Sequence, residues 1–179
     1  MDMTQNQTNL YPLGKDKDIV IKTFMGNEDM VSLILPNYDE ATATEDLDVL
    51  LKEHLFKTIS IDNAQIEKKV YVCVETYVPE IENDAIKKIA IIINVFAHQS
   101  LIDLSVKEQA KFLTKGYYGN RVDMLIDVID RCLNGKRNVG LGRLRLRPRS
   151  PIGILQPVNG YYGKSLEYII SDFNSIDEY

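Results

Sequence analysis

Hydrophobic side chains along this chain change their spacing several times, and each change marks a different predicted element. Residues 16–35 place apolar side chains three and four positions apart, which is the spacing of an amphipathic helix. Gly26 and Asn27 interrupt the pattern, so we expect one interrupted helix or two short helices, the second capped by Asn27. Residues 1–15 are mostly polar and are expected to form a tail.

The spacing then changes to that of strands. Residues 68–78 are rich in β-branched and aromatic side chains, as strands are. Residues 79–84 include Pro, Asn and Asp, which predict a turn. Residues 85–98 are apolar for most of their length, and their consecutive isoleucines favour a strand near the middle of a sheet. Together these segments predict a β-hairpin, and the loop after it is expected to hold a helical stretch at 107–113.

The clearest helix is predicted at Arg121–Leu133, where apolar residues recur at i, i+3, i+4, i+7 and i+11. Asn120 is placed to cap its start, and Asn134-Gly135 is typical of a helix end. One polar side of the helix carries three carboxylates, Asp123, Asp127 and Asp130. Their spacing could hold a hard cation, but a solvated helix face is much the commoner explanation. We therefore predict no metal site.

A basic strand is predicted after this helix, at residues 139–149. Strict alternation places its arginines on one side and Leu144 and Leu146 on the other. Pro148 limits the segment to a sheet edge or a strand end. The Pro- and Gly-containing segment 150–163 is expected to be a loop, and a last, half-exposed strand is predicted at 164–173. The candidate interface or DNA-facing residues of this region are Lys136, Arg137, Arg143, Arg145, Arg147 and Arg149.

This order of elements predicts an α+β fold, with a mixed or antiparallel sheet flanked by helices. The 179 residues fit one domain with extensions, which we divide into short N-terminal helices with a tail at 1–44 and a domain at 45–179. No run of about 18 apolar residues and no signal-peptide pattern is present, so we expect no membrane contact and synthesis in the cytoplasm. Cys73 and Cys132 lack paired spacing and are expected to be free core residues.

The sequence contains no recognisable catalytic constellation. Its two histidines are His54, expected on an amphipathic surface segment, and His98, expected to hydrogen-bond the backbone at a strand end. The glycines at 135–142 follow a helix and lack the Lys-Ser/Thr pair of a phosphate loop. We therefore expect a protein that is not an enzyme and that uses no cofactor.

Charge is distributed unevenly along the chain. Residues 1–90 carry 17 acidic and 9 basic side chains, whereas residues 91–179 carry 9 acidic and 12 basic ones. No acidic residue occurs from Cys132 to Leu166. The arginines of this segment could contact nucleic-acid phosphates, meet an acidic surface of a neighbouring subunit, or form an ordinary solvated strand face. The acidic N-terminal half offers a complementary surface, which favours subunit contact.

The order of elements resembles that of bacteriophage tail terminator and head–tail joining (neck) proteins. The resemblance rests on the strand ending Ile93-Asn94-Val95-Phe96, on the helix and basic segment RVDMLIDVIDRCLNGKRNVGLGRLRL, and on the final strand with Leu166, Tyr168 and Ile170. It covers roughly residues 45–173. It implies a tail-terminator-like fold and carries over no catalytic residue.

The resemblance also implies a function and partners. Members form a ring, expected to be hexameric, in the neck of the virion, where they cap the tail tube and join it to the head connector. Such a ring would have a heterologous interface, and arginines facing its lumen could contact the DNA that passes through. The alternative is a nucleic-acid-binding regulator that uses the strand Arg143–Arg149.

Overall fold

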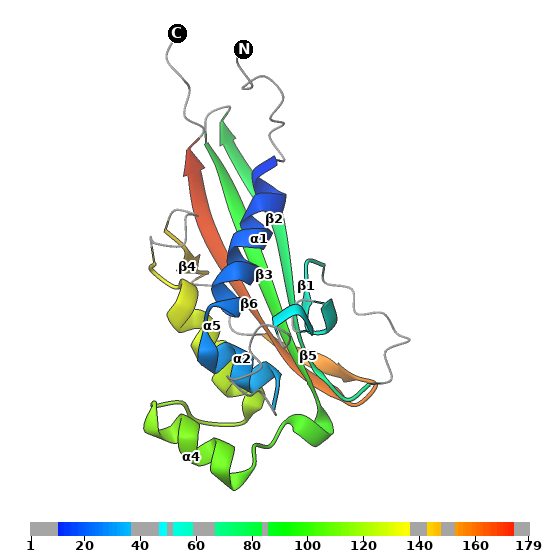
Figure 1. The fold of residues 1–179 in the computed structure, drawn as a ribbon. Coiled ribbons are helices and arrows are strands. Elements are labelled where there is room, and N and C mark those ends of the chain that lie inside the picture. Colours follow the sequence, from blue (N-terminus) through cyan, green and yellow to red (C-terminus); the bar gives the residue numbers. More distant parts are fainter. Residues whose placement is uncertain are drawn as a thin grey trace.

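The computed structural model describes residues 11–36, 47–49, 52–58, 67–83, 86–136, 143–147 and 153–173. Within these ranges, helices lie against a long, twisted sheet (Figure 1). The helices are α1 (Tyr11–Met25), α2 (Glu28–Ile34), α4 (Val106–Thr114) and α5 (Arg121–Leu133), with a short 3-10 helix at Gln99–Leu101. The strands are β1 (Leu55–Phe56), β2 (Val70–Asn83), β3 (Ile86–His98), β4 (Arg145–Leu146), β5 (Gly153–Val158) and β6 (Tyr161–Phe173).

The six strands form one mixed sheet in the order β1-β2-β3-β6-β4, with β5 also paired to β6. β1 runs parallel to β2, and all other pairs are antiparallel. β3 lies along one edge of β6, whereas β5 and β4 share its other edge, β5 near Lys164 and β4 at Tyr168 and Ile169. This arrangement confirms the predicted α+β class with a mixed sheet.

The predicted β2–β3 hairpin is present, but β2 is longer than expected. It continues through Pro79 to Asn83, so the predicted turn at 79–84 is wrong. The pairing with β3 is irregular between Tyr77 and Glu80. A proline is tolerated there because, among the described residues, β1 pairs with β2 only at Val72 and Cys73, which leaves Pro79 on an edge. The bulge absorbs the missing N–H without ending the strand.

The segment 150–163 was predicted to be a loop, and this is also wrong. Residues from Gly153 onward form β5, which turns back into β6 through Asn159 and Gly160. Both turn residues have positive φ, 51° and 79°. A two-residue turn with this backbone matches the twist of the strands, and Asn-Gly is its favoured sequence.

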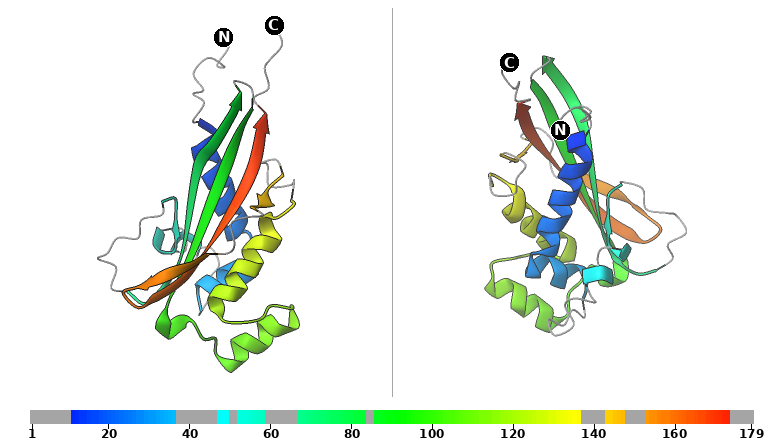
Figure 2. Two further views of the ribbon diagram at one scale, coloured as in Figure 1. Left: turned by 180° about the vertical axis from the view of Figure 1, so that it is seen from behind. Right: turned by 45° about the horizontal axis from the view of Figure 1, so that its top comes forward.

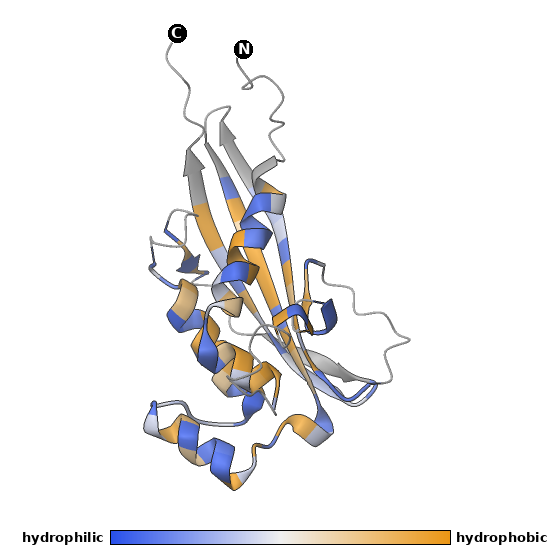
Figure 3. Cartoon of the chain, in the orientation of Figure 1, coloured by the Kyte–Doolittle hydropathy of each residue, from blue (hydrophilic) through white to orange (hydrophobic). Residues whose placement is uncertain are grey.

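Helices α1, α2 and α5 all cover the same face of the sheet (Figures 1 and 2). Side chains of that face, such as Ile91, Ile93 and Leu166, pack with Phe24 of α1 and Leu125 of α5 in one buried cluster. Apolar residues accordingly concentrate in the middle of the strands and along α5 (Figure 3). Seen from behind, the opposite face of the sheet carries none of the described helices (Figure 2).

The N-terminal helices agree in part with expectation. Two helices separated at Gly26-Asn27 are confirmed, and the Asn27 side chain accepts a hydrogen bond from the Met30 amide at 2.9 Å. The predicted tail is wrong from Tyr11 onward, because α1 begins there. Residues 1–10 lie outside the described ranges. The division into 1–44 and 45–179 stays a prediction.

Candidate interaction surface around α5 and β4

α5 is the element that positions the candidate surface, and its bounds are those predicted. Asn120 and Asp123 form a capping box, in which the Asn120 side chain accepts from the Asp123 amide at 3.0 Å and Asp123 accepts from the Asn120 amide at 3.1 Å. The helix ends before Asn134, and Gly135 adopts a φ of +70°, as a C-terminal glycine should.

Arg121, at the start of α5, is a buried cation that the sequence pattern did not single out. Its side chain is 2% exposed and donates to the carbonyls of Leu101 at 2.7 Å and Leu33 at 3.0 Å. It also pairs with Glu108 of α4 at 3.2 Å. Arg121 therefore joins α2, α4 and α5, which is a structural role.

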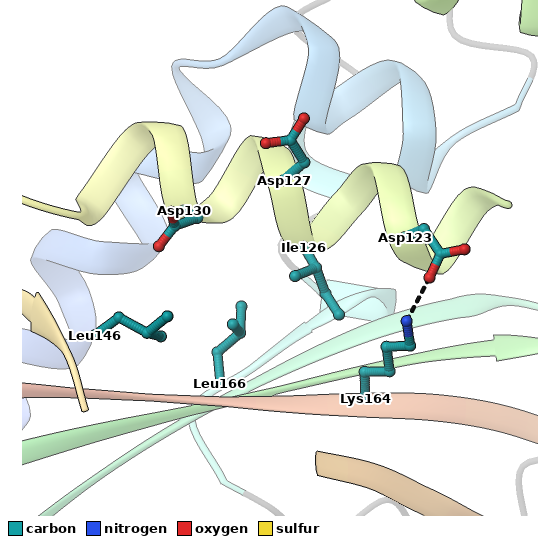
Figure 4. Close-up of a pocket in the computed structure, with 7 residues that line it drawn as sticks. All are labelled: Asp123, Ile126, Asp127, Asp130, Leu146, Lys164 and Leu166. Atoms are coloured by element: carbon teal, nitrogen blue, oxygen red, sulfur yellow. Dashed lines mark hydrogen bonds and ion pairs between the residues drawn. The ribbon is translucent and has the colours of Figure 1, made fainter. Parts of the chain in front are cut away.

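A groove runs between α5 and the edge of the sheet formed by β4 and β6 (Figure 4). Its volume is about 310 Å³. Its apolar lining comes from Ile126 of α5, Leu146 of β4 and Leu166 of β6. Its polar rim consists of Asp123, Asp127, Asp130 and Lys164. Asp123 and Asp130 point toward this apolar floor, whereas the Asp127 carboxylate points away from the sheet (Figure 4).

Each of these carboxylates has a partner in the chain. Asp123 pairs with Lys164 at 2.5 Å, and this hydrogen bond holds the pKa of Lys164 above its usual range. Asp127 pairs with Arg131 at 2.7 Å. Asp130 accepts a hydrogen bond from the Tyr168 hydroxyl at 2.9 Å. In the part of the chain that the structure describes, no three His, Cys, Asp or Glu side chains are grouped as metal ligands would be.

The predicted basic strand is present as β4, which pairs with Ile169 and Tyr168 of β6. The alternation is confirmed over 143–147, because Leu144 is buried and Leu146 half-buried while the three arginines are exposed. Lys136 is also exposed. The predicted residues Arg137 and Arg149 lie outside the described ranges.

The arginines of this strand are not equivalent. Arg147 pairs with Glu167 at 2.7 Å, and the Tyr77 hydroxyl donates to the same carboxylate oxygen at 2.5 Å. This hydrogen bond to Glu167 raises the pKa of Tyr77. The side chains of Arg143 and Arg145 make no hydrogen bond or ion pair to any described residue. Within residues 143–147, the unpaired positive charges are therefore those of Arg143 and Arg145.

His54 is buried, and its expected place on a surface segment is wrong. It precedes β1, is 6% exposed, and its Nδ1 lies 2.6 Å from the Val70 carbonyl. Burial lowers the pKa of this imidazole, which favours the neutral donor form. His98 caps the turn after β3 by accepting from the Ser100 amide at 3.2 Å, as predicted. Both histidines are therefore engaged in holding strand ends.

Both cysteines are free, as predicted. Cys73 is fully buried on β2, and burial raises the pKa of its thiol to about 12. Cys132 is half-buried on α5 and accepts a hydrogen bond from the Asn27 side chain at 3.2 Å. Neither thiol has the low pKa that a reactive cysteine needs.

Exposed apolar side chains form a second surface feature that the sequence analysis missed. Four large ones are exposed among the described residues, and three of them, Val106, Leu113 and Tyr118, belong to α4 and the loop after it. The signal was present, because Val106, Ala110 and Leu113 follow helical spacing. The pattern alone did not show which side of α4 faces solvent.

Comparisons with known proteins bear on the chain as a whole. Of the described helices, none is both long and apolar enough to span a membrane. No curated protein matches the chain. A family model does match it, over residues 27–170, which include α2, α4, α5, the first five strands and most of β6. The chain therefore belongs to the YomW family, which is phage-derived.

Proposed function

We propose that this protein is a structural component of the bacteriophage virion, which forms a ring in the neck, caps the tail tube and joins it to the head connector. Membership of a phage-derived family supports the phage setting. The resemblance to tail terminator and neck proteins supports the place within the particle. In this proposal the protein is made in the host cytoplasm and ends in the virion.

One observation carries the proposal: surfaces of different character lie side by side on the same edge of the sheet. Arg143 and Arg145 are exposed and uncommitted, whereas the adjoining groove has an apolar floor and an acidic rim. A ring needs two different patches on each subunit, so that one copy binds the next head to tail. Charges on such patches favour the correct partner and its orientation.

The same residues support an assembly role over catalysis. His54 and His98 are hydrogen-bonded to neighbouring backbone, and the groove carboxylates are paired with groups of the chain. Burial raises the pKa of both thiols. A nucleophile needs a base within hydrogen-bond reach. His98 Nδ1 does lie 2.8 Å from the Ser100 hydroxyl, but the same nitrogen accepts the Ser100 amide in the cap of the turn after β3. We propose that the protein acts through its surfaces alone.

Native mass spectrometry tests this function. The full chain is measured alone and after mixing with purified tail tubes. The proposal expects a closed ring, hexameric by the resemblance, and binding to one end of the tube. A chain that neither closes into a ring nor binds tube or connector contradicts it.

Nucleic-acid binding is the second candidate, and the exposure of Arg143 and Arg145 favours it. Arg147 weakens this candidate because Glu167 neutralises it. Each phosphate contact contributes about −0.9 to the slope of log affinity against log salt. A regulator that uses both free arginines should therefore lose roughly two contacts in an Arg143→Ala/Arg145→Ala variant.

A gel shift at several salt concentrations separates the two candidates. The control is Lys22→Ala/Lys52→Ala, which removes two exposed positive charges elsewhere. A regulator binds more weakly and with a smaller salt slope after the arginine changes but not after the control changes. If the arginines contact a neighbouring subunit and not DNA, the arginine variant and the control variant should lose affinity equally, or the monomer should not bind DNA.

A further inference from the structure

α4 presents an apolar stripe to solvent. Val106 is 87% exposed and Leu113 41%, and Ala110 between them is exposed as well. These residues stand at i, i+4 and i+7, which places them on one side of the helix. Tyr118, 71% exposed, follows in the adjoining loop. Exposed apolar groups that cluster in this way mark interaction sites more often than scattered ones do.

The opposite side of α4 is anchored, so the stripe has a fixed direction. Phe112 is buried, and Glu108 pairs with Arg121 at 3.2 Å. Lys115, just after the helix, pairs with Asp29 at 2.5 Å. The start is fixed by a capping box between Ser105 and Glu108. A stripe held in place before binding loses little conformational entropy on binding.

Exposed lysines flank the stripe. Lys107 and Lys111 lie on the side between the stripe and the anchored face. α4 therefore combines apolar anchors with a basic margin. Its best partner is an apolar groove with an acidic margin, in the way that amphipathic helices dock into grooves.

The groove between α5 and β4 has these properties. Ile126, Leu146 and Leu166 form its floor (Figure 4). Among the rim carboxylates, Asp130 accepts hydrogen bonds from Tyr168 and Asn134, which are neutral groups, so no described cation neutralises it directly. A lysine from outside would supply that cation.

The dimensions of the two surfaces also match. The rim runs from Asp123 to Asp130 and the stripe from Val106 to Leu113, so each has eight residues, which are seven steps along its helix. At 1.5 Å per residue, each is about 10 Å long. α4 lies at the lower end of the molecule and the groove beside β4 on its flank, so one copy cannot bring its own helix into its own groove (Figure 1).

We propose that α4 of one copy docks into the α5–β4 groove of a second copy. Val106 and Leu113 would cover the apolar floor, and Lys107 or Lys111 would face Asp130. Because the two patches differ, the contact is head to tail and can continue from copy to copy. This inference rests on the proposed ring function and names the contact that would build the ring.

Two assembly-defective variants test the contact. Leu113→Asp damages the helix but leaves the groove intact, and Asp127→Arg damages the groove rim but leaves the helix intact. Both sites are exposed, 41% for Leu113 and 41% for the side chain of Asp127, so both proteins should fold. Val106→Asp, at an 87% exposed position, is a second helix variant. Leu113→Met and Asp48→Arg, the latter at an exposed site outside the groove, are the matched controls.

Mass photometry over a concentration series gives the readout. Each of the three damaging variants should associate at least about tenfold more weakly than wild type, whereas the controls should match wild type. An equal mixture of Leu113→Asp and Asp127→Arg should form pairs and stop there, because the pair has one intact contact inside and damaged surfaces at both ends.

Several results would overturn the inference. If wild type assembles and the damaging variants assemble equally well, this contact is wrong while the ring function stands. If the mixture forms nothing larger than either variant alone, the head-to-tail arrangement is wrong. If wild type associates through this contact but neither closes into a ring nor binds tail tubes, the contact stands and the proposed function fails. A wild type that remains a monomer at every concentration rejects both.

Discussion

Helices α4 and α5 begin in the same way but end up in different surroundings. Both start with a capping box, Ser105 with Glu108 and Asn120 with Asp123. α5 buries its apolar side against the sheet, with Leu125 and Ile129 fully covered. α4 buries Phe112 but leaves Val106 and Leu113 in solvent.

This difference shows that the residues that form a helix do not determine which of its sides is buried. Caps and helical spacing are local, and both helices have them. Cover for an apolar stripe must come from another element, and within the described part of the chain α4 has none for its outer side. The contrast motivates the proposal that a second copy supplies the cover, and it can be tested helix by helix.

Removing a core side chain of α5 should have the largest effect. Ile129→Ala creates a cavity at a fully buried position and should lower the free energy of unfolding by about 2–5 kcal/mol. Leu113→Ala on α4 should cost less than about 1 kcal/mol in the monomer, because that side chain is already partly in water. Urea unfolding at a concentration too low for assembly measures both. Equal losses would show that the stripe of α4 is covered within the monomer.

Arg121 connects the two helices, and its replacement should cause the next largest decrease in the free energy of unfolding. Arg121→Met leaves the Leu33 and Leu101 carbonyls and Glu108 without their charged donor, which should cost about 2–3 kcal/mol. Lys57→Met removes an exposed pair with Asp18 and should cost about 1 kcal/mol or less. Hydrogen exchange should also become faster in α4 for Arg121→Met alone. Unchanged α4 exchange would mean that Arg121 does not hold the helix.

Removal of either cap should cost about 1 kcal/mol locally, but the two losses should appear in different measurements. Asn120→Ala should lower the global free energy of unfolding, because α5 belongs to the core. Ser105→Ala should speed exchange in α4 and change global unfolding little, because α4 can open by itself. Equal global effects would place α4 and α5 in one cooperative unit.

Acid should open α4 before α5. Partial burial raises the pKa of Glu108, but hydrogen bonds from the Ser105 hydroxyl and amide and from Arg121 outweigh it, so this pKa lies below 4.5. The folded state therefore gains stability from Glu108 above about pH 4.5 and loses it as the pH falls through the lowered pKa. Exchange measured from pH 6 to 3 and corrected for intrinsic rates should show this. A Glu108→Gln variant should lose the pH dependence, and simultaneous opening of α5 would contradict the account.

Val106→Asp should have the smallest effect on folding. The position is 87% exposed and lies in the first turn, where a carboxylate suits the positive helix end. The free energy of unfolding of the monomer should change by less than about 0.5 kcal/mol. A larger loss would show that Val106 contributes to the fold, and would remove the reason to assign it to an interface.

Elements with a strong local signal were predictable from the sequence. α5, the break at Asn27 and the alternation around Arg145 depend on spacing and caps, which are local. The end of β2 was missed because a proline is tolerated on a sheet edge, and edges are known only from the assembled sheet. The β5–β6 hairpin was missed because the prolines and glycines around it suggested a loop. Asn159-Gly160 is nevertheless a favoured sequence for a two-residue hairpin turn.

The candidate surface was less predictable. The arginines were identified, but their inequality depends on Glu167 and Tyr77, which are brought to Arg147 by strand pairing. The groove joins α5 with β4 and β6, segments up to 43 residues apart in the sequence, from Asp123 to Leu166. The exposure of one side of α4 depends on what the rest of the chain fails to cover. These features depend on how the helices and strands are arranged in space, which the spacing of residues along the sequence does not determine.

Hydrogen exchange of the wild-type chain at low and high protein concentration tests the central claim most directly. If α4 docks into the α5–β4 groove of another copy, amides in α4 and in β4 should become protected together as the concentration rises, while those in the already stable centre of β3 should not change. Concentration-dependent protection confined to other parts of the chain, or none under conditions where assembly is seen, would contradict the claim.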